Sequence, residues 1–157
     1  MIDTEKESPQ FGKVDPYTLF SDILNGSMPA SFVYRDDTVA AFMDIRPINA
    51  GHVLVVPIQP VESLSDLDEE IAAHLFRMGH RISKAIRYTN LKCEGINFFL
   101  ADGEVAGQEV FHVHLHVFPR FSKDGFGLKH SENNLKFVSR DELDNVAEII
   151  SKELHKI

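Results

Sequence analysis

The sequence contains a single cysteine, Cys93, among 157 residues, so it cannot form an internal disulfide bond. Residues 1–6 lack the basic stretch and the apolar core of a secretory signal. No apolar run approaches the roughly 20 residues that a membrane-spanning helix needs. These absences predict a protein of a reducing, cytoplasmic compartment that has no membrane as a partner.

Positive charge is also scarce. The chain has 16 Lys and Arg against 24 Asp and Glu, a formal net charge of −8. That balance opposes a broad electrostatic grip on a nucleic-acid backbone, so we expect no nucleic acid polymer as a partner. A small anionic ligand is still compatible, because a few oriented backbone amides or histidines can form a local positive site.

The apolar content is sufficient for one compact domain. Hydrophobic residues make up 43% of the chain and include twelve Phe, enough to bury a core of ordinary size. Residues 1–15 are polar and contain Pro9 and Gly12, which predicts a flexible N-terminal arm. We therefore expect a single domain over residues 16–157.

The spacing of apolar residues predicts an α+β fold with a mostly antiparallel sheet. The expected strands are 31–35, 39–43, 52–57, 96–100 and 110–118, of which 52–57 is apolar throughout and should be central. The expected helices are a short one from Tyr17 to Asn25-Gly26, a long one over 67–86 with Asp66 and Glu69 as its capping box, and a C-terminal one over 139–155 capped by Ser139 and Glu142.

Three histidines alternate with apolar residues in the last expected strand: His112, His114 and His116. A strand sends successive side chains to opposite faces, so the three imidazoles should share one face, with successive Cα atoms about 7 Å apart. The intervening apolar side chains, starting from Phe111, should pack into the core. The pattern would let the three rings reach one phosphate or one metal ion.

Three interpretations of this run compete. A purely structural role is disfavoured, because burying three imidazoles without a ligand leaves several ring nitrogens without partners. A zinc site is as compatible with the spacing as a phosphate site, since His-x-His with a third His can hold zinc and leave one position open. The isolated histidines at positions 74, 80, 130 and 155 are expected to be ordinary, mostly solvent-facing residues and receive no role.

The run resembles the signature of the histidine triad (HIT) family, in which three histidines alternate with apolar residues. Further segments are similar to family segments over residues 17–127: Gly26–Ala30, Asp44–Pro47, Gly51–Pro57, Asn97–Gly103, 106–108 and 118–120. The resemblance implies a HIT-like fold, a five-stranded mostly antiparallel sheet with a long helix packed on it, here with an additional C-terminal helix. The pattern falls between the nucleotide-binding branch and the dinucleoside-polyphosphate hydrolases.

The resemblance also implies an activity. His114 occupies the position that attacks the α-phosphorus of a purine nucleotide derivative, either a dinucleoside polyphosphate or a nucleoside phosphoramidate, to form a covalent nucleotidyl-histidine. His112 and His116 would flank the phosphate and donate hydrogen bonds to its oxygens and to the leaving group. This chemistry uses no cofactor and no metal ion, and family members commonly form homodimers.

The family's nucleotide-binding positions fall here on Met28, Phe42, Asp44, Ile45, His52, Gly107, Gln108 and Glu109. His52, the family's fourth histidine, could equally have a structural role at the mouth of the buried strand. Asp44 would accept hydrogen bonds from the ribose hydroxyls. The side chains of Met28, Phe42 and Ile45 would form an apolar slot for the base, although Phe42 and Ile45 could equally be core residues. Gly107 lets the backbone approach the phosphate. The next two residues offer backbone amides, and Gln108 is placed to reach the leaving group.

The sequence departs from the family in three places. The structural-zinc ligands of many members, Cys-x-x-Cys and a later His, are replaced by Thr18 to Ser21 and by Pro60, which predicts no structural zinc. Ala101 replaces a frequent Asn or Gln, which weakens the case for cleavage of long polyphosphates. Glu109 replaces a Ser of phosphoramidases. A non-catalytic nucleotide sensor or scaffold, and a metal-dependent hydrolase, therefore stay as alternatives.

Overall fold

The computed structural model describes residues 14–129 and 136–157. Internal contacts divide the chain into two compact units, with the boundary between Asp124 and Gly125. The expected single domain over 16–157 stays a prediction. The expected N-terminal arm over 1–15 lies almost entirely outside the described residues.

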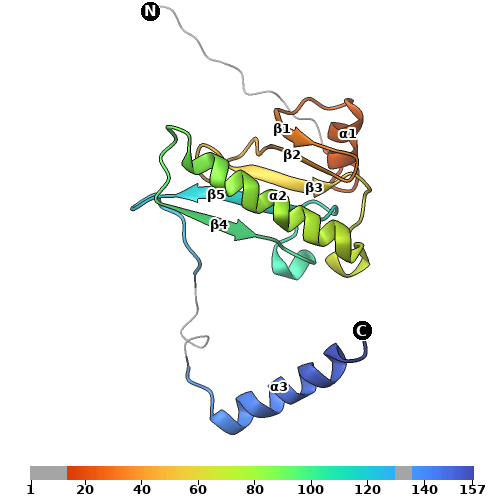
Figure 1. Ribbon diagram of the computed structural model, residues 1–157, viewed down its shortest axis with the longest axis vertical. Coiled ribbons are helices and arrows are strands. Elements are labelled where there is room, and N and C mark those ends of the chain that lie inside the picture. Colours follow the sequence, from red (N-terminus) through yellow and green to blue (C-terminus); the bar gives the residue numbers. More distant parts are fainter. Residues whose placement is uncertain (1–13, 130–135) are drawn as a thin grey trace, which may run out of the picture. The chain divides into compact units, whose positions relative to one another are not determined.

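The first unit is built on a five-stranded sheet in the order β1-β2-β3-β5-β4, in which every neighbouring pair is antiparallel (Figure 1). The strands are β1 (Phe32–Arg35), β2 (Val39–Met43), β3 (Val53–Pro57), β4 (Gly95–Phe99) and β5 (Leu115–Arg120). All five residues of β3 are buried, as expected for a central strand whose two faces are both covered. The predicted α+β architecture is confirmed.

The last strand differs from its prediction. The expected strand covered 110–118, whereas β5 begins at Leu115 and runs through Pro119 to Arg120. Residues 110–114 leave the ladder because their backbone N–H groups bond elsewhere: Phe111 N–H donates to Pro16 O and Val113 N–H to Val61 O. Only one of the three alternating histidines, His116, therefore lies in regular β structure.

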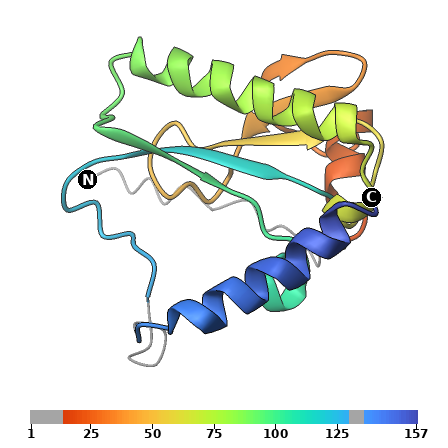
Figure 2. The same ribbon diagram turned by 60° about the horizontal axis from the view of Figure 1, so that its bottom comes forward.

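The long helix α2 (Glu69–Arg87) lies across one face of the sheet (Figure 1 and Figure 2). Its apolar face meets side chains of β2, β3 and β5, namely Val39, Ala41, Val53, Val55, Leu115 and Val117. The predicted capping box is wrong: Asp68 is the N-cap, and its carboxylate accepts from Glu70 N and Ile71 N. The stretch Leu64–Asp66 forms a separate 3-10 turn, η1, so the helix starts later than its apolar periodicity indicates.

The short helix α1 (Leu19–Asn25) packs on side chains of the opposite sheet face. Phe20, Ile23 and Leu24 form a second core with the buried residues of β2 and β3 that point away from α2: Ala40, Phe42, Leu54 and Val56. The helix ends at Gly26, whose φ of 87° is left-handed, as the Asn25-Gly26 stop signal predicted. This second face carries the histidines.

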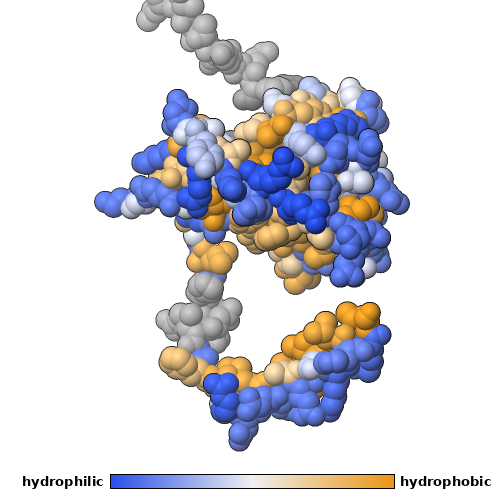
Figure 3. All heavy atoms as spheres, viewed as in Figure 1, coloured by the Kyte–Doolittle hydropathy of each residue, from blue (hydrophilic) through white to orange (hydrophobic). Residues whose placement is uncertain are grey.

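The second unit contains α3 (Arg140–Leu154). Ser139 is its N-cap and its hydroxyl accepts from Glu142 N–H, which confirms the predicted cap. Apolar side chains gather along one side of this helix (Figure 3), and Leu143, Val146, Ile150 and Leu154 are all exposed. Within 14–129 and 136–157, no helix is long and apolar enough to cross a membrane.

Candidate active site

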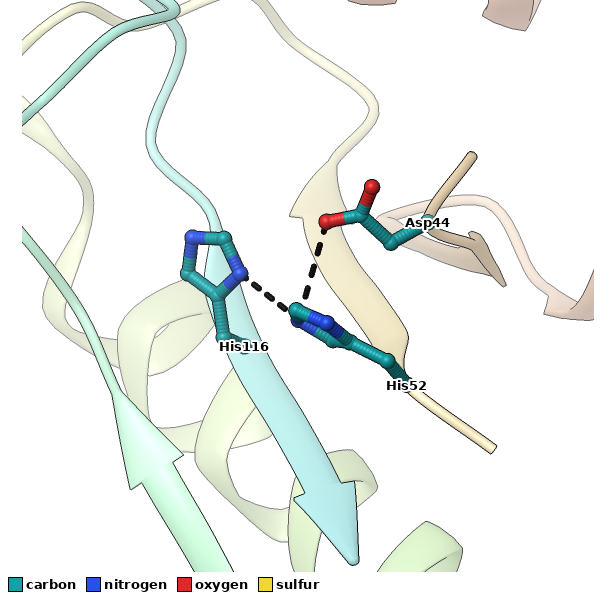
Figure 4. Close-up of side chains that lie close together, drawn as sticks. All are labelled: Asp44, His52 and His116. Atoms are coloured by element: carbon teal, nitrogen blue, oxygen red, sulfur yellow. Dashed lines mark hydrogen bonds and ion pairs between the residues drawn. The ribbon is translucent and has the colours of Figure 1, made fainter. Parts of the chain in front are cut away.

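The strand registers bring distant residues together on the sheet face that lies opposite α2. Phe42 pairs with Leu54, and Leu54 pairs with His116. Because alternate strand residues point to the same side, His52 and His116 project from that face, and Asp44 follows at the end of β2. Figure 4 shows these last three side chains converging from three segments.

The triad keeps its alternation although two of its members precede the strand. Val113, Leu115 and Val117 enter the core beneath α2. On the other side, the rings of His112 and His114 stand edge to face with Phe20 of α1, with centroids 5.7 and 5.2 Å away. The rings of His114 and His116 are 4.9 Å apart. Phe111 does not join the core as expected; it stacks on Tyr17 at 4.6 Å.

A backbone hydrogen bond fixes the tautomer of His114. Its Nδ1 lies 2.7 Å from the carbonyl oxygen of His112. A carbonyl only accepts, so Nδ1 carries the proton and Nε2 keeps a free lone pair. The side chain is 5% exposed, and its ring is held by this bond and by Phe20. The arrangement presents one oriented nitrogen nucleophile.

A second chain of bonds fixes His52 and His116. Ile48 N–H donates to Nδ1 of His52 at 3.1 Å, so the proton of a neutral His52 is on Nε2. That Nε2 lies 2.9 Å from Nδ1 of His116 and 3.6 Å from Oδ2 of Asp44. His52 therefore donates to His116, whose own proton must lie on Nε2. The outcome is an N–H donor on His116, oriented by His52 (Figure 4).

His112 directs its proton away from its triad neighbours. Its Nε2 donates to the carbonyl of Pro57 at 2.8 Å. The other nitrogen, Nδ1, is buried and has no hydrogen-bond partner among the described residues. To donate to a phosphate, as the family resemblance implies, neutral His112 would have to give up the Pro57 bond. What it supplies in this geometry is the carbonyl that orients His114.

Burial keeps the rings uncharged. Desolvation lowers the pKa of His52, His112 and His114 below the usual value of 6.5. The pKa of His116 falls to about 4, because burial acts together with repulsion from His114 and His52. Asp44 and Glu109 oppose the shift at His114 without reversing it. All four imidazoles are therefore neutral near pH 7, which the four tautomer assignments require.

The residues expected to bind the nucleoside separate into two groups. Asp44 is part-buried, and its Oδ1 accepts from the backbone N–H of Arg46. Ile45 beside it is 66% exposed and available to a ligand. Phe42 belongs to the core, where its ring packs edge to face with Phe20 and Phe32. Met28 packs partly buried against the same core.

The loop before the triad is braced from inside. Gln108 is buried, its Oε1 accepts from Gly103 N–H, and its Nε2 donates to the carbonyls of Glu62 and Val110. The side chain expected to reach a leaving group is thus fully engaged in holding the loop. Gly107, with φ of 97°, ends the 3-10 turn η2 (Glu104–Ala106) in a conformation that favours glycine.

The sequence analysis missed two residues that line the candidate site, Arg46 and Phe20. Glu109 was expected to contribute a backbone amide, but its exposed carboxylate also pairs with Arg46 Nη2 at 3.2 Å. Arg46 lay inside a matched segment, and a cation two residues after Asp44, the residue expected to bind ribose, was a usable signal. Phe20 packs edge to face against the rings of His112 and His114, but in the sequence it looked like any other apolar residue of a helix face.

Asp44, His52 and His116 also offer three ligand atoms within 4.8 Å of one another. Two imidazoles and a carboxylate are a donor set that zinc accepts. However, metal binding at Nε2 of His52 would displace its proton to Nδ1, where Ile48 N–H already points. A structural zinc of the family type does not fit either, since Thr18, Ser21 and Pro60 offer neither thiolate nor imidazole. The geometry favours a hydrogen-bonded chain over a metal site.

These features define an α+β domain in which His114 presents a free Nε2 lone pair beside the proton-bearing ring of His116. The family model described as "HIT domain" matches residues 25–123, and the chain belongs to this family. An uncharacterized HIT-like protein of Borreliella burgdorferi is 45% identical over 112 residues, which is 71% of this chain and 81% of that protein.

Solved structures support the same family assignment. A HIT family protein from Bacillus anthracis superposes with a TM-score of 0.77 and 36% identity, covering 86% of this chain and 95% of that one. A histidine triad nucleotide-binding protein from Candida albicans gives a TM-score of 0.76 and 25% identity, covering 88% and 97%. The family includes nucleotide-binding proteins and hydrolases.

Proposed function

We propose that this protein hydrolyses or transfers the nucleotidyl group of purine nucleotide derivatives, with His114 as the nucleophile. The observation that carries the proposal is the bond from His114 Nδ1–H to the carbonyl of His112, which leaves Nε2 as an oriented lone pair on a neutral ring. A neutral imidazole is an effective nucleophile near pH 7 and can divide one difficult displacement into two easier steps.

In the first step, Nε2 of His114 bonds to the α-phosphorus while the bond from phosphorus to the leaving group breaks. The leaving group departs with the electron pair of that bond. His116 lies beside His114 with its proton on Nε2, so it supplies the hydrogen bond or the proton that the leaving atom needs. His52 keeps His116 in the donor tautomer.

In the second step, water attacks the same phosphorus, the bond from phosphorus to Nε2 breaks, and the mononucleotide leaves. The lone pair returns to His114. One proton of the water goes to His116 where that ring gave up its proton in the first step, and to the solvent where the leaving group departed as an anion. An alcohol or phosphate acceptor in place of water would give transfer. The cycle uses the chain's own residues and neither a cofactor nor a metal ion.

The nucleoside would bind on the Asp44 side of the triad. Within residues 14–129 and 136–157, Oδ2 of Asp44 accepts no hydrogen bond and lies 3.6 Å from Nε2 of His52, so it can accept from ribose hydroxyls. The exposed side chain of Ile45 would cover one face of the base, with Met28 nearby and Phe42 supporting the wall from the core. Gly107 and the backbone of Gln108 and Glu109 would face the phosphate.

We further propose a cytoplasmic homodimer with no nucleic acid polymer or membrane as partner. The edge strand β4 and the outer side of α2 support the dimer, because exposed Phe76 packs on Phe98 there and Phe99 is also exposed. An unpaired strand edge beside exposed aromatic rings is a surface that a second copy can cover. Light scattering of the purified protein measures this assembly directly.

The test is AMP release from adenosine 5′-phosphoramidate and from diadenosine tetraphosphate, with and without a chelator. His114→Asn should lower turnover at least 1,000-fold while AMP still binds, because only the covalent step is removed. His80→Asn, an exposed histidine on α2, is the matched control and should retain full activity. Chelator-sensitive release would favour the metal-dependent alternative, and AMP binding without any release would make the protein a nucleotide sensor.

A further inference from the structure

An ion pair spans two segments of the proposed active site. Arg46 lies in the loop after β2, and Glu109 lies 63 residues later, just before the triad. The Nη2 and Oε2 atoms are 3.2 Å apart, and the side chains are 82% and 78% exposed. An ion pair so open to solvent holds its partners weakly, so either side chain can exchange its partner for a ligand at little cost.

Both residues are attached to groups that serve the reaction. The backbone N–H of Arg46 donates to Oδ1 of Asp44, the proposed ribose acceptor. Glu109 follows the buried brace Gln108, and its carboxylate lies close enough to His114 to favour a proton on that ring. The pair therefore joins the loop that carries the proposed ribose acceptor to the segment that leads into the triad.

The two side chains of the pair act in opposite directions on a polyphosphate substrate. A Glu109 carboxylate near the nucleophile repels phosphate groups beyond the scissile bond, and the chain's net charge of −8 adds to that repulsion. A guanidinium forms its strongest hydrogen bonds with phosphate oxygens and can hold two of them at once. Arg46 is close enough to screen Glu109 and exposed enough to bind the substrate instead.

We propose that Arg46 and Glu109 together set the enzyme's discrimination between leaving groups by charge, favouring those that carry phosphate. In the free protein, Arg46 neutralises Glu109. When a substrate with phosphate groups beyond the α-phosphate binds, the guanidinium moves to those groups, and a neutral amine leaving group gains nothing from this exchange. The inference rests on the proposed function and names its substrate class as nucleotide derivatives with anionic leaving groups.

The test compares Arg46→Gln, Arg46→Lys and Glu109→Gln on the two substrates above. Arg46→Gln should lower the ratio of kcat/KM for diadenosine tetraphosphate to that for adenosine 5′-phosphoramidate about tenfold, roughly one charge-assisted hydrogen bond. Arg46→Lys should keep part of the preference, and Glu109→Gln should raise the ratio. Arg77→Gln, an exposed arginine on α2, should leave it unchanged. An unchanged ratio in Arg46→Gln would overturn the proposal.

A binding measurement separates this inference from the proposed function. In the His114→Asn background, the ratio of Kd for AMP to Kd for ATP should fall about tenfold when Arg46 becomes Gln, whether or not the native protein turns over. Loss of turnover with this binding effect intact would remove the enzyme but keep the discrimination. Turnover with an unchanged Kd ratio would remove the discrimination but keep the enzyme, and failure to bind either nucleotide would remove both.

Discussion

Nε2 of His52 lies 2.9 Å from Nδ1 of His116, and the backbone N–H of Ile48 occupies the other nitrogen of His52. The direction of the proton is therefore set two bonds away from the triad, by a backbone amide. Under the proposed function, His52 is a positioning residue: it touches no reacting atom, yet it decides which nitrogen of His116 can donate to a leaving group.

Replacing His52 should affect chemistry more than binding. Without the hydrogen bond from His52, His116 can adopt either tautomer. The free energy of about one hydrogen bond that orients the His116 ring is then lost. We expect His52→Gln and His52→Ala to lower kcat about tenfold or more with little change in KM. Steady-state kinetics on both substrates measures this split.

A merely structural role for His52 would show a different result. The melting temperature of each variant, measured beside its kinetics, identifies a loss that comes from unfolding. A rise in KM with kcat unchanged would mean that His52 serves nucleotide binding, and it would contradict the positioning role of His52 toward His116.

The rate should fall with acid, below pH 6.5. Burial lowers the pKa of His114 from 6.5, so the ring stays an available nucleophile from pH 8 down past 6.5 and is lost only as the pH falls through the lowered pKa. His116 protonates near its pKa of about 4. The profile of kcat/KM against pH tests this, and a midpoint above 6.5 would contradict it.

Stability must be followed over the same pH range. The unfolded chain binds protons on these histidines below pH 6.5, whereas the folded chain binds them only below its lowered pKa values, so protonation favours unfolding as the pH falls from 6.5 toward 4. Circular dichroism at each pH distinguishes this acid unfolding from the titration of the nucleophile.

Gln108→Leu should destabilise the fold by about 2–3 kcal/mol. The substitution leaves the N–H of Gly103 and the carbonyls of Glu62 and Val110 without the partners that the buried amide provides. Urea unfolding measures the change. Gln59→Leu is the matched control at an exposed position and should shift the free energy of unfolding by less than about 0.5 kcal/mol. Equal effects of the two variants would remove the bracing role.

Local patterns predicted the elements well where one physical signal dominated. The unbroken apolar run at 52–57 predicted a central buried strand, and Asn25-Gly26 predicted the end of α1. The start of α2 was misplaced because Asp66 and Asp68 are both good N-caps, and the choice depends on which backbone amides become free. The predicted start of the triad strand lay too near the N-terminus for a similar reason. The hydrogen-bond partners of Phe111 and Val113 lie in distant segments of the chain.

The sequence by itself determined the chemistry that is available: three histidines on alternate positions, an aspartate and a fourth histidine in segments similar to those of a known family, and an excess of acidic over basic residues. Only the tertiary structure decided which nitrogen of each ring holds its proton. That choice depends on carbonyls and amides from His112, Pro57 and Ile48, which no local pattern encodes. The pairing of Arg46 with Glu109 and the inward turn of Gln108 were decided in the same way, because hydrogen bonds and ion pairs form between atoms that folding brings within 3 Å or so.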